Sequence, residues 1–173
     1  MKKKIAILGS TGSIGRTLLN IISKDKKNFE IVLLTANKNY KTLFKQAKEF
    51  NVKNVILTNS YIYKSLKNKN YPFKVNIFNS FKYFNKIFKK KIDYVMSSII
   101  GLDGLYPTLN IIKHTKKIAI ANKESLICAW DLIRKELIKY KTKFIPVDSE
   151  HYSIYDLLKN HKISDVEKIY ITA

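Results

Sequence analysis

Two acidic residues follow an apolar run in the sequence FIPVDSEHYSIY, at residues 144–155. Asp148 and Glu150 are separated only by Ser149, so in an extended backbone both carboxylates point to the same side. Carboxylate oxygens arranged in this way suit Mg²⁺ or Mn²⁺. In the alternative interpretation, Asp148 caps a helix and Glu150 lies in its first turn, where both charges favour the helix dipole. The spacing alone supports both interpretations equally.

A second polar cluster, Asn122, Lys123 and Glu124, follows the apolar run at residues 117–121. If this run and the run at 143–147 are strands of one parallel sheet, both clusters lie at the carboxyl edge of that sheet. Open α/β sheets bind their ligands at this edge. The second cluster therefore favours a metal or ligand site over a simple helix cap.

A glycine-rich turn, ILGSTGSIGRTLL, joins the first apolar run to a helical pattern. Gly9, Gly12 and Gly15 follow the spacing G-x-x-G-x-x-G, which allows a tight turn, close approach of a pyrophosphate and close packing of helix on strand. This spacing differs by one residue from the commoner dinucleotide fingerprint. The start of the helix would favour an anion. The backbone N–H groups available to it are those of Thr11, Gly12, Ser13 and Ile14.

The end of the second predicted strand, LLTANKNY, indicates which dinucleotide would bind. NAD-binding folds usually place Asp or Glu here to bind the ribose hydroxyl groups. This chain instead has Asn37, Lys38 and Asn39, with no acid. A carboxylate would repel the 2′-phosphate of NADP, whereas the Lys38 ammonium would pair with it. The sequence therefore favours NADPH over NADH.

Strand-like runs alternate with helical patterns along the chain, which predicts an α/β fold with a parallel, Rossmann-like sheet. The predicted strands are residues 4–8, 30–35, 54–57, 94–97, 117–121 and 143–147. The predicted helices are residues 13–23, 40–50, 105–114 and 124–140. Residues 59–91 are predicted to hold one or two helices around an extended piece at 73–78. We expect a cofactor domain over residues 1–147 and the beginning of a catalytic domain over 148–173, with a short helix in SIYDLLKNH and a strand in VEKIYITA.

The formal net charge of +20 raises the possibility of nucleic-acid binding. Arg16 and Arg134 are the only arginines, and the abundance of Lys, Asn, Ile and Tyr is typical of A/T-rich codons. Base-reading proteins usually rely on arginine, so composition argues against a nucleic-acid partner. The single cysteine, Cys128, and the lack of a long apolar run predict a cytoplasmic protein without a membrane segment. We expect Cys128 to be an inert core residue and His114 to be a cation at a helix end.

Three motifs, ILGSTGSIG, ANKESL and PVDSEH, resemble the 1-deoxy-D-xylulose 5-phosphate reductoisomerase family in order and separation. The resemblance extends from residue 4 to the end of the sequence. It implies an enzyme of the non-mevalonate route to isoprenoids that forms 2-C-methyl-D-erythritol 4-phosphate with NADPH and Mg²⁺ or Mn²⁺. The implied substrate is a small phosphorylated sugar, and the implied full-length protein is a homodimer.

The resemblance also assigns roles by position. The implied cofactor-binding residues are Thr11, Gly12, Ser13, Ile14, Asn37, Lys38, Asn39, Asn122 and Glu124. Asn37 stands where the family often has glycine. The implied substrate-binding residues are Lys123, Ser149 and Glu150, and the implied metal ligands are Asp148 and Glu150. Lys123, Asp148 and Glu150 are then the candidate catalytic residues, because a metal polarises a carbonyl and Lys123 brings positive charge near developing oxyanions.

The family pattern continues past residue 173 with a Ser-Gly-Gly segment, a third carboxylate ligand, a phosphate site and a lid. The resemblance therefore implies that this chain is a fragment that binds NADPH weakly and turns over little by itself. Two other interpretations remain open from the residues alone. One is a different NADP-dependent oxidoreductase that does not need the acid pair, and the other is a basic, non-catalytic module that binds anions or nucleic acid.

Overall fold

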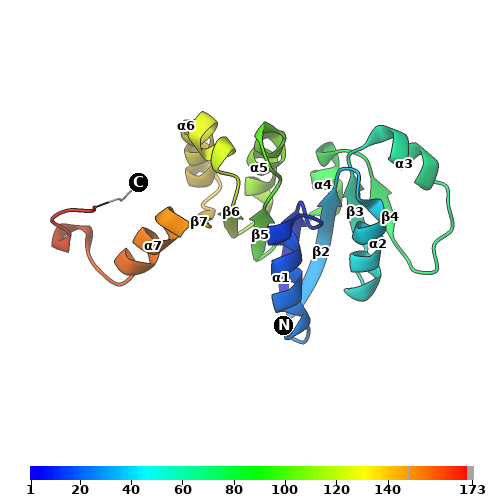
Figure 1. Ribbon diagram of the computed structural model, residues 1–173, viewed down its shortest axis with the longest axis horizontal. Helices are drawn as coiled ribbons and strands as arrows, with labels where there is room; N and C mark the ends of the chain where they lie inside the picture. Colours follow the sequence, from blue (N-terminus) through cyan, green and yellow to red (C-terminus); the bar gives the residue numbers. More distant parts are fainter. Residues whose placement is uncertain (148, 171–173) are drawn as a thin grey trace.

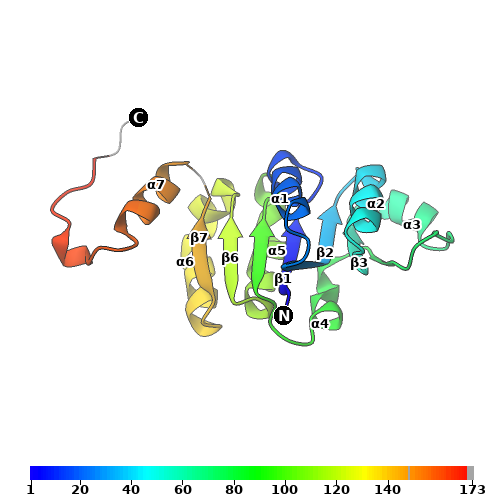
Figure 2. The ribbon, with the colours of Figure 1, turned by 90° about the horizontal axis from the view of Figure 1, so that it is seen from below.

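A seven-stranded parallel sheet forms the centre of the fold in a computed structural model that describes residues 1–147 and 149–170 (Figure 1). The strands lie in the order β4-β3-β2-β1-β5-β6-β7, and all point in the same direction (Figure 2). Their bounds are β1 Lys3–Leu8, β2 Phe29–Ala36, β3 Asn54–Leu57, β4 Asn76–Phe78, β5 Tyr94–Ser97, β6 Lys117–Ile120 and β7 Lys143–Pro146.

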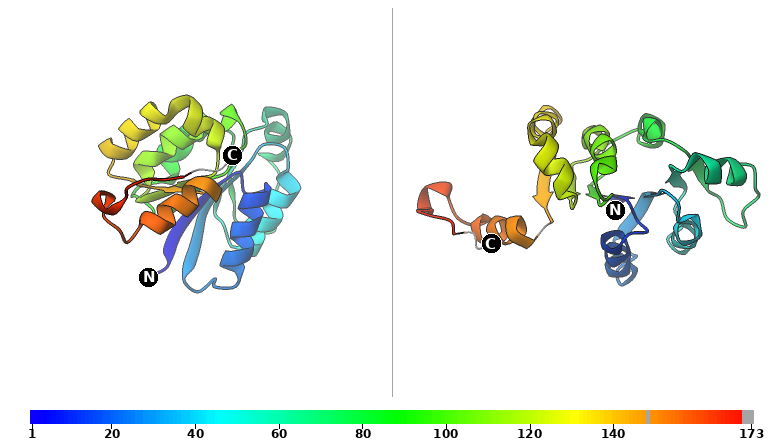
Figure 3. Two further views of the ribbon diagram at one scale, coloured as in Figure 1. Left: turned by 60° about the vertical axis from the view of Figure 1, so that its left-hand side comes forward. Right: turned by 45° about the horizontal axis from the view of Figure 1, so that its top comes forward.

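Helices cover both faces of the sheet: α1 and α2 lie on one face, and α4, α5 and α6 lie on the other (Figure 1). The α-helices are α1 Ser13–Ser23, α2 Tyr40–Glu49, α3 Ser60–Leu66, α4 Phe84–Ile87, α5 Leu105–Ile111, α6 Lys123–Lys139 and α7 Ser149–Leu158. The described residues also form the short 3₁₀ helices η1 Phe81–Tyr83, η2 Leu102–Gly104, η3 Ile112–His114 and η4 Ile163–Asp165. Helix α7 lies beyond β7, at that edge of the sheet (Figures 2 and 3).

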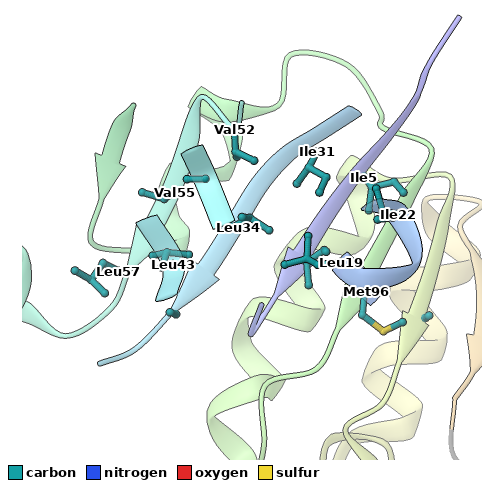
Figure 4. Packing of buried hydrophobic residues seen from close by; sticks show 14 of the residues in the cluster. Ile5, Leu19, Ile22, Ile31, Leu34, Leu43, Val52, Val55, Leu57 and Met96 are labelled. Carbon is teal, nitrogen blue, oxygen red and sulfur yellow. The ribbon is translucent and has the colours of Figure 1, made fainter. Parts of the chain in front are cut away.

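Side chains of the central strands alternate between two apolar clusters. On β1, Ile5 and Ile7 contribute to the cluster under α1 and α2, which Figure 4 shows. The intervening Ala6 and Leu8 contribute to the cluster under α4, α5 and α6. Because both faces of the strand are buried, its sequence is apolar throughout instead of alternating with polar residues.

The direction of strand order reverses between β1 and β5, which lie side by side. Their register pairs Ile5 with Tyr94 and Leu8 with Ser97. Strands β2, β3 and β4 extend from β1 on one side, and β6 and β7 extend from β5 on the other. A doubly wound sheet leaves a crevice at such a reversal, outside the carboxyl ends of the strands. The topology thus places a ligand site next to the loop that follows β1.

The predicted α/β fold with a parallel sheet is confirmed, and the six strands predicted between residues 4 and 147 each begin and end within one residue of an observed strand. The predicted extended piece at 73–78 contains β4, and α3, η1 and α4 account for the helical part of 59–91. The strand predicted in VEKIYITA is wrong for residues 166–170, which have no strand structure. No strand among the described residues pairs with this segment, and an isolated strand leaves its backbone groups without partners.

The buried face of α6 explains why the expectation for Cys128 is wrong. Helix α6 buries every fourth residue, namely Ser125, Ala129, Ile133 and Leu137. Cys128 lies outside this stripe and is exposed. None of the helices in the part of the chain that the structure describes is both long and apolar enough to cross a bilayer.

His114 is a neutral core residue instead of the predicted helix-end cation. Its ring lies against Phe84 and Phe88, with centroids 6.2 Å and 5.4 Å away, and only 8% of the residue is exposed. Nε2 has no hydrogen-bond partner among the residues described. Burial, with a smaller contribution from the charge of Lys113, lowers the pKa of His114 from 6.5 to about 4. The imidazole is therefore uncharged at neutral pH.

Acid should destabilise the fold through His114. The lowered pKa means that the unfolded chain binds the proton more tightly, so stability is fully present above pH 6.5 and is lost as the pH falls towards 4. We expect the free energy of unfolding, measured with urea, to fall by roughly 2 to 3 kcal/mol between pH 7.5 and 4.5 from this group. His114→Phe should remove this part of the pH dependence, and an unchanged slope in the variant would contradict the assignment.

Candidate functional site

A cleft of about 500 Å³ opens at the carboxyl ends of the strands, where β1 and β5 adjoin. One segment of its wall follows β1, a second is the end of β2 with the next residue, and a third follows β5. The two other lining residues are Thr58, directly after β3, and Phe81 in η1. The lining residues are Gly9, Thr11, Gly12, Thr35, Ala36, Asn37, Thr58, Phe81, Ser98, Ile99, Ile100 and Asp103. The cleft therefore lies at the reversal of strand order, where the topology predicts a ligand.

The glycine loop is held in a single conformation by β2. Gly9 has φ +81, a left-handed conformation that glycine adopts without strain. Its N–H donates to Thr35 Oγ1 at 2.9 Å, and the N–H of Ser10 donates to the Thr35 carbonyl oxygen at 3.0 Å. A Cβ on Gly15 would lie 2.6 Å from the Gly9 oxygen, so α1 packs directly on the loop. The loop thus has the tight turn and close helix packing that its spacing predicts.

The start of α1 faces the same loop. Gly12 is the N-cap residue and brings no side chain to cap the first turn. Ser13 and Ile14 are the first two residues of α1. The first backbone hydrogen bond of the helix runs from the Arg16 N–H to the Gly12 carbonyl oxygen at 3.0 Å, so the N–H groups of Ser13 and Ile14 come before it. N–H groups at this position are free to bind an anion. Thr11 and Gly12 line the cleft, whereas Ser13 and Ile14 have exposed side chains beside it.

The second predicted cofactor segment reaches the cleft through Asn37. Asn37 lines the cleft and has no positive φ, so its backbone conformation does not require the glycine common in the family. Lys38 is exposed and does not line the cleft. Asn39 is the N-cap of α2, where its Oδ1 accepts from the Thr42 N–H at 3.2 Å. Lys38 is thus available at the rim, while the Asn39 side chain holds the helix start.

Asn122 connects the ANKESL cluster to the cleft, although Asn122 is not itself a lining residue of the cleft. The residue is 2% exposed and is the N-cap of α6, where its Oδ1 accepts from the Ser125 N–H at 2.8 Å. Its Nδ2 donates to the carbonyl oxygens of Ile99 and Gly101, the latter at 2.6 Å. Since Ile99 lines the cleft, Asn122 holds part of the cleft wall. Its amide is fully used by these bonds, so any effect of this side chain on a cofactor passes through the 99–101 loop.

Lys123 and Glu124 begin α6, immediately after β6. Lys123 is exposed, and Glu124 is half-buried in the first turn, where its charge favours the helix dipole. Strand β6 pairs with β7, whose last residue, Pro146, lies two positions before Asp148 in the sequence. The two polar clusters therefore follow neighbouring strands at one edge of the sheet, as the sequence predicts.

The acid pair, Asp148 and Glu150, lies in the sequence where β7 has ended and α7 begins. Asp148 is outside the described residues, and Ser149 and Glu150 begin α7 with side chains that are also outside the description. Among the residues described, no three His, Cys, Asp or Glu side chains are close enough to hold a metal ion. The metal ligands Asp148 and Glu150 therefore stay a prediction.

Sequence reasoning missed part of the cleft wall. Thr58 follows β3 directly, and Ser98, Ile99 and Ile100 follow β5 directly. The rule that ligands bind at the carboxyl ends of strands could have found these residues. Phe81 lies in η1, within residues 59–91, and no local sequence signal marks it as a cleft residue. Asp103 is an acidic residue at the cleft that the sequence analysis did not consider.

Comparison with known proteins gives a consistent set of relatives. A family model described as 1-deoxy-D-xylulose 5-phosphate reductoisomerase matches residues 5–130. The chain is 64% identical over 177 residues to the 1-deoxy-D-xylulose 5-phosphate reductoisomerase of Pelagibacter ubique, covering 99% of the chain and 45% of the relative. It is 39% identical over 175 residues to that of Clostridium kluyveri, with the same coverage. The chain thus spans less than half the length of these curated relatives.

Solved structures of the same enzyme share the fold. The reductoisomerase from Zymomonas mobilis in complex with NADPH superposes with a TM-score of 0.84 at 33% identity, covering 93% of this chain and 42% of that one. A reductoisomerase in complex with NADPH, fosmidomycin and magnesium gives a TM-score of 0.80 at 33% identity, covering 89% of this chain and 38% of that one. These solved structures therefore share the fold of this chain over most of its length.

Proposed function

This chain belongs to the 1-deoxy-D-xylulose 5-phosphate reductoisomerase family, and we propose that it supplies the NADPH-binding part and the first catalytic residues of that activity. The proposed reaction converts 1-deoxy-D-xylulose 5-phosphate to 2-C-methyl-D-erythritol 4-phosphate with NADPH and a divalent metal. The observation that carries the proposal is the cleft at the reversal of strand order, which has the glycine loop as one wall. Two reductoisomerases solved in complex with NADPH have the same fold.

Residues of this chain fit NADPH in two places. Gly9 and Gly15 leave no room for a Cβ against neighbouring backbone, so the loop is compact beneath the space that a pyrophosphate would enter. The N–H groups of Thr11, Ser13 and Ile14 would bind the pyrophosphate at the start of α1. The Gly12 N–H donates to the Gly9 carbonyl oxygen at 3.1 Å, so Gly12 would serve the site by shaping the turn. Asn37, Lys38 and Asn39 would contact the adenosine ribose, with the Lys38 ammonium beside the 2′-phosphate. Bound NADPH would supply the hydride, while this chain positions the dinucleotide along the cleft.

The metal and substrate would bind beside β6 and β7. Asp148 and Glu150 would hold Mg²⁺ or Mn²⁺ through carboxylate oxygens, the ligands that these ions prefer. Lys123 would place its charge next to a small phosphorylated sugar substrate, with Ser149 and Glu150 as further substrate contacts. Asn122 and Glu124 would complete the cofactor side of this cluster, Asn122 by holding the 99–101 loop. Mn²⁺ binding detected by electron paramagnetic resonance tests this assignment, which fails if binding persists in Asp148→Asn/Glu150→Gln.

The proposed organisation divides the chain at the end of the sheet. Residues 1–147 hold every strand that the structure describes and would form the cofactor domain. Residues 148–173 would begin the catalytic domain, since α7 and the segment after it lie beyond β7 (Figure 3). We further propose a homodimer for the full-length enzyme and a cytoplasmic location.

Titration of the chain with reduced dinucleotides tests the cofactor proposal. NADPH should bind at least about tenfold more tightly than NADH, because a phosphate paired with an ammonium group contributes roughly 1.5 kcal/mol or more. The enhancement of dinucleotide fluorescence measures both affinities.

Lys38→Ala is the matched variant for this experiment, because Lys38 is exposed and its removal should leave the fold intact. The variant should lose affinity for NADPH and keep its affinity for NADH. Equal binding of the two dinucleotides by the wild-type chain would contradict the preference for NADPH. Absence of binding to either would contradict the proposed function.

A further inference from the structure

A buried polar link joins helix α2 to the glycine loop. Gln46 on α2 is 7% exposed, and Ser10 in the loop is fully buried. Gln46 Nε2 donates to the Ser10 carbonyl oxygen at 3.0 Å, and Ser10 Oγ donates to Gln46 Oε1 at 2.9 Å. Because a carbonyl oxygen can only accept, the orientation of the Gln46 amide is unambiguous. One side chain thus binds both the backbone and the side chain of the same loop residue.

Gln46 lies on the apolar face of its helix. The other buried residues of α2 are Leu43 and Ala47, which pack in the core beneath the sheet. A buried amide costs free energy unless its donor and acceptor are both satisfied. The two bonds to Ser10 satisfy one donor and the acceptor of Gln46. An apolar residue of the same size would pack here without needing either bond, so core packing alone does not explain glutamine.

The same link connects the two predicted cofactor segments. The N–H of Ser10 donates to the Thr35 carbonyl oxygen at 3.0 Å, which ties the loop to the end of β2. Ser10 precedes Thr11 and Gly12, which line the cleft. Helix α2 begins at Tyr40, immediately after residues 37–39. A rigid helix that is bonded to the loop therefore sets the distance between the phosphate-binding N–H groups and the segment expected to meet the 2′-phosphate.

We propose that Gln46 is a positioning residue for cofactor binding, which acts through Ser10 to hold the glycine loop at a fixed distance from residues 37–39. This inference rests on the proposed NADPH-binding function. Gln46 does not touch the cofactor in this proposal. It prevents the loop from relaxing away from β2 and α2. The loop N–H groups can then meet the pyrophosphate while residues 37–39 meet the 2′-phosphate, without rearrangement.

A double-mutant cycle on NADPH affinity tests the proposal. Gln46→Met keeps the length and volume of the side chain and removes both hydrogen bonds, and Ser10→Ala removes the Ser10 hydroxyl. Gln46→Met should bind NADPH about tenfold more weakly. Ser10→Ala keeps the bond from Gln46 Nε2 to the Ser10 carbonyl oxygen, so it should lose less affinity than Gln46→Met. The double variant should bind no more weakly than Gln46→Met alone, because the bond that Ser10→Ala removes is already absent in Gln46→Met. Affinities are compared at a temperature where circular dichroism shows each variant folded.

Thr142→Val is the matched control. Thr142 is 6% exposed, and its Oγ1 lies 2.9 Å from the carbonyl oxygens of Ile112 and Thr115, which share its single O–H donor. It precedes β7, at the edge of the sheet opposite to the cleft. The control also loses a buried polar interaction, so it should lower the melting temperature without changing NADPH affinity. In a double variant with Gln46→Met, the two losses of melting temperature should add, and the NADPH affinity should equal that of Gln46→Met alone.

The outcomes separate the two proposals. If Gln46→Met binds NADPH within twofold of wild type, or if the effects of Gln46→Met and Ser10→Ala multiply, Gln46 has only a structural role and the inference is wrong. Ser10→Ala, the smaller change, decides the same question if Gln46→Met does not fold. If the wild-type chain binds no NADPH, the proposed function fails and this inference fails with it.

Discussion

Alanine at Gly15 should abolish NADPH binding by this chain. A Cβ at this position would lie 2.6 Å from both the Gly9 carbonyl oxygen and the Ser10 Cα, and 2.8 Å from the Ser10 carbonyl carbon. All three are backbone atoms and cannot rotate away, so the glycine loop and α1 must separate to make room for the methyl group. We expect about 3 kcal/mol of destabilisation from this overpacking. A displacement of about 1 Å in the N–H groups that would bind the pyrophosphate should cost at least about a hundredfold in affinity.

Gly12→Ala is the control for folding. The nearest atom to a Cβ on Gly12 is the Gly9 oxygen at 3.4 Å, which is an ordinary contact. Gly12 has φ −75, which alanine adopts freely. Glycine is preferred over alanine at an N-cap, so Gly12→Ala should lower the free energy of unfolding by about 1 kcal/mol, which is well short of the loss expected for Gly15→Ala. If Gly15→Ala is as stable as Gly12→Ala and binds NADPH with the wild-type affinity, the prediction is wrong. NADPH binding then does not depend on the close packing of α1 on the loop.

Aspartate at Asn122 should destabilise the fold and weaken cofactor binding together. The carboxylate could still accept from the Ser125 N–H and cap α6. It could not donate to the carbonyl oxygens of Ile99 and Gly101, which would face a negative charge in a buried position. Losing two buried hydrogen bonds and adding this repulsion should cost roughly 2 to 4 kcal/mol, measured by urea unfolding.

The packing around Asn122 allows little relaxation. A Cβ on Gly104 would overlap the Asn122 amide, so the 99–104 turn already lies in close contact with the side chain. NADPH affinity should fall with stability, because the freed segment is part of the cleft wall. Asn122→Ser is the matched control for capping, because serine also accepts from the helix N–H groups and carries no charge. Equal stability of Asn122→Asp and wild type would show that the 99–101 loop does not depend on this clamp.

The elements of the fold were predictable because their signals are local. On β1, four apolar residues, from Ile5 to Leu8, show a strand buried on both faces, and the glycine spacing after it shows a tight turn into a helix. Neighbouring residues decide such patterns, so one sequence suffices to read them. The same holds for the acid-free end of β2, which favours NADPH. The three motifs also identify the family, since their order and separation are properties of the sequence.

Only the tertiary structure decided which side chains complete the site and what surrounds the isolated polar residues. The bond between Gln46 and Ser10 spans 36 positions, and that between Asn122 and Ile99 spans 23. Local periodicity contains no information about such pairs, because they depend on which helix packs on which strand. For the same reason Cys128 is exposed and His114 is buried, contrary to expectation: the burial of each depends on how its helix is rotated against the sheet.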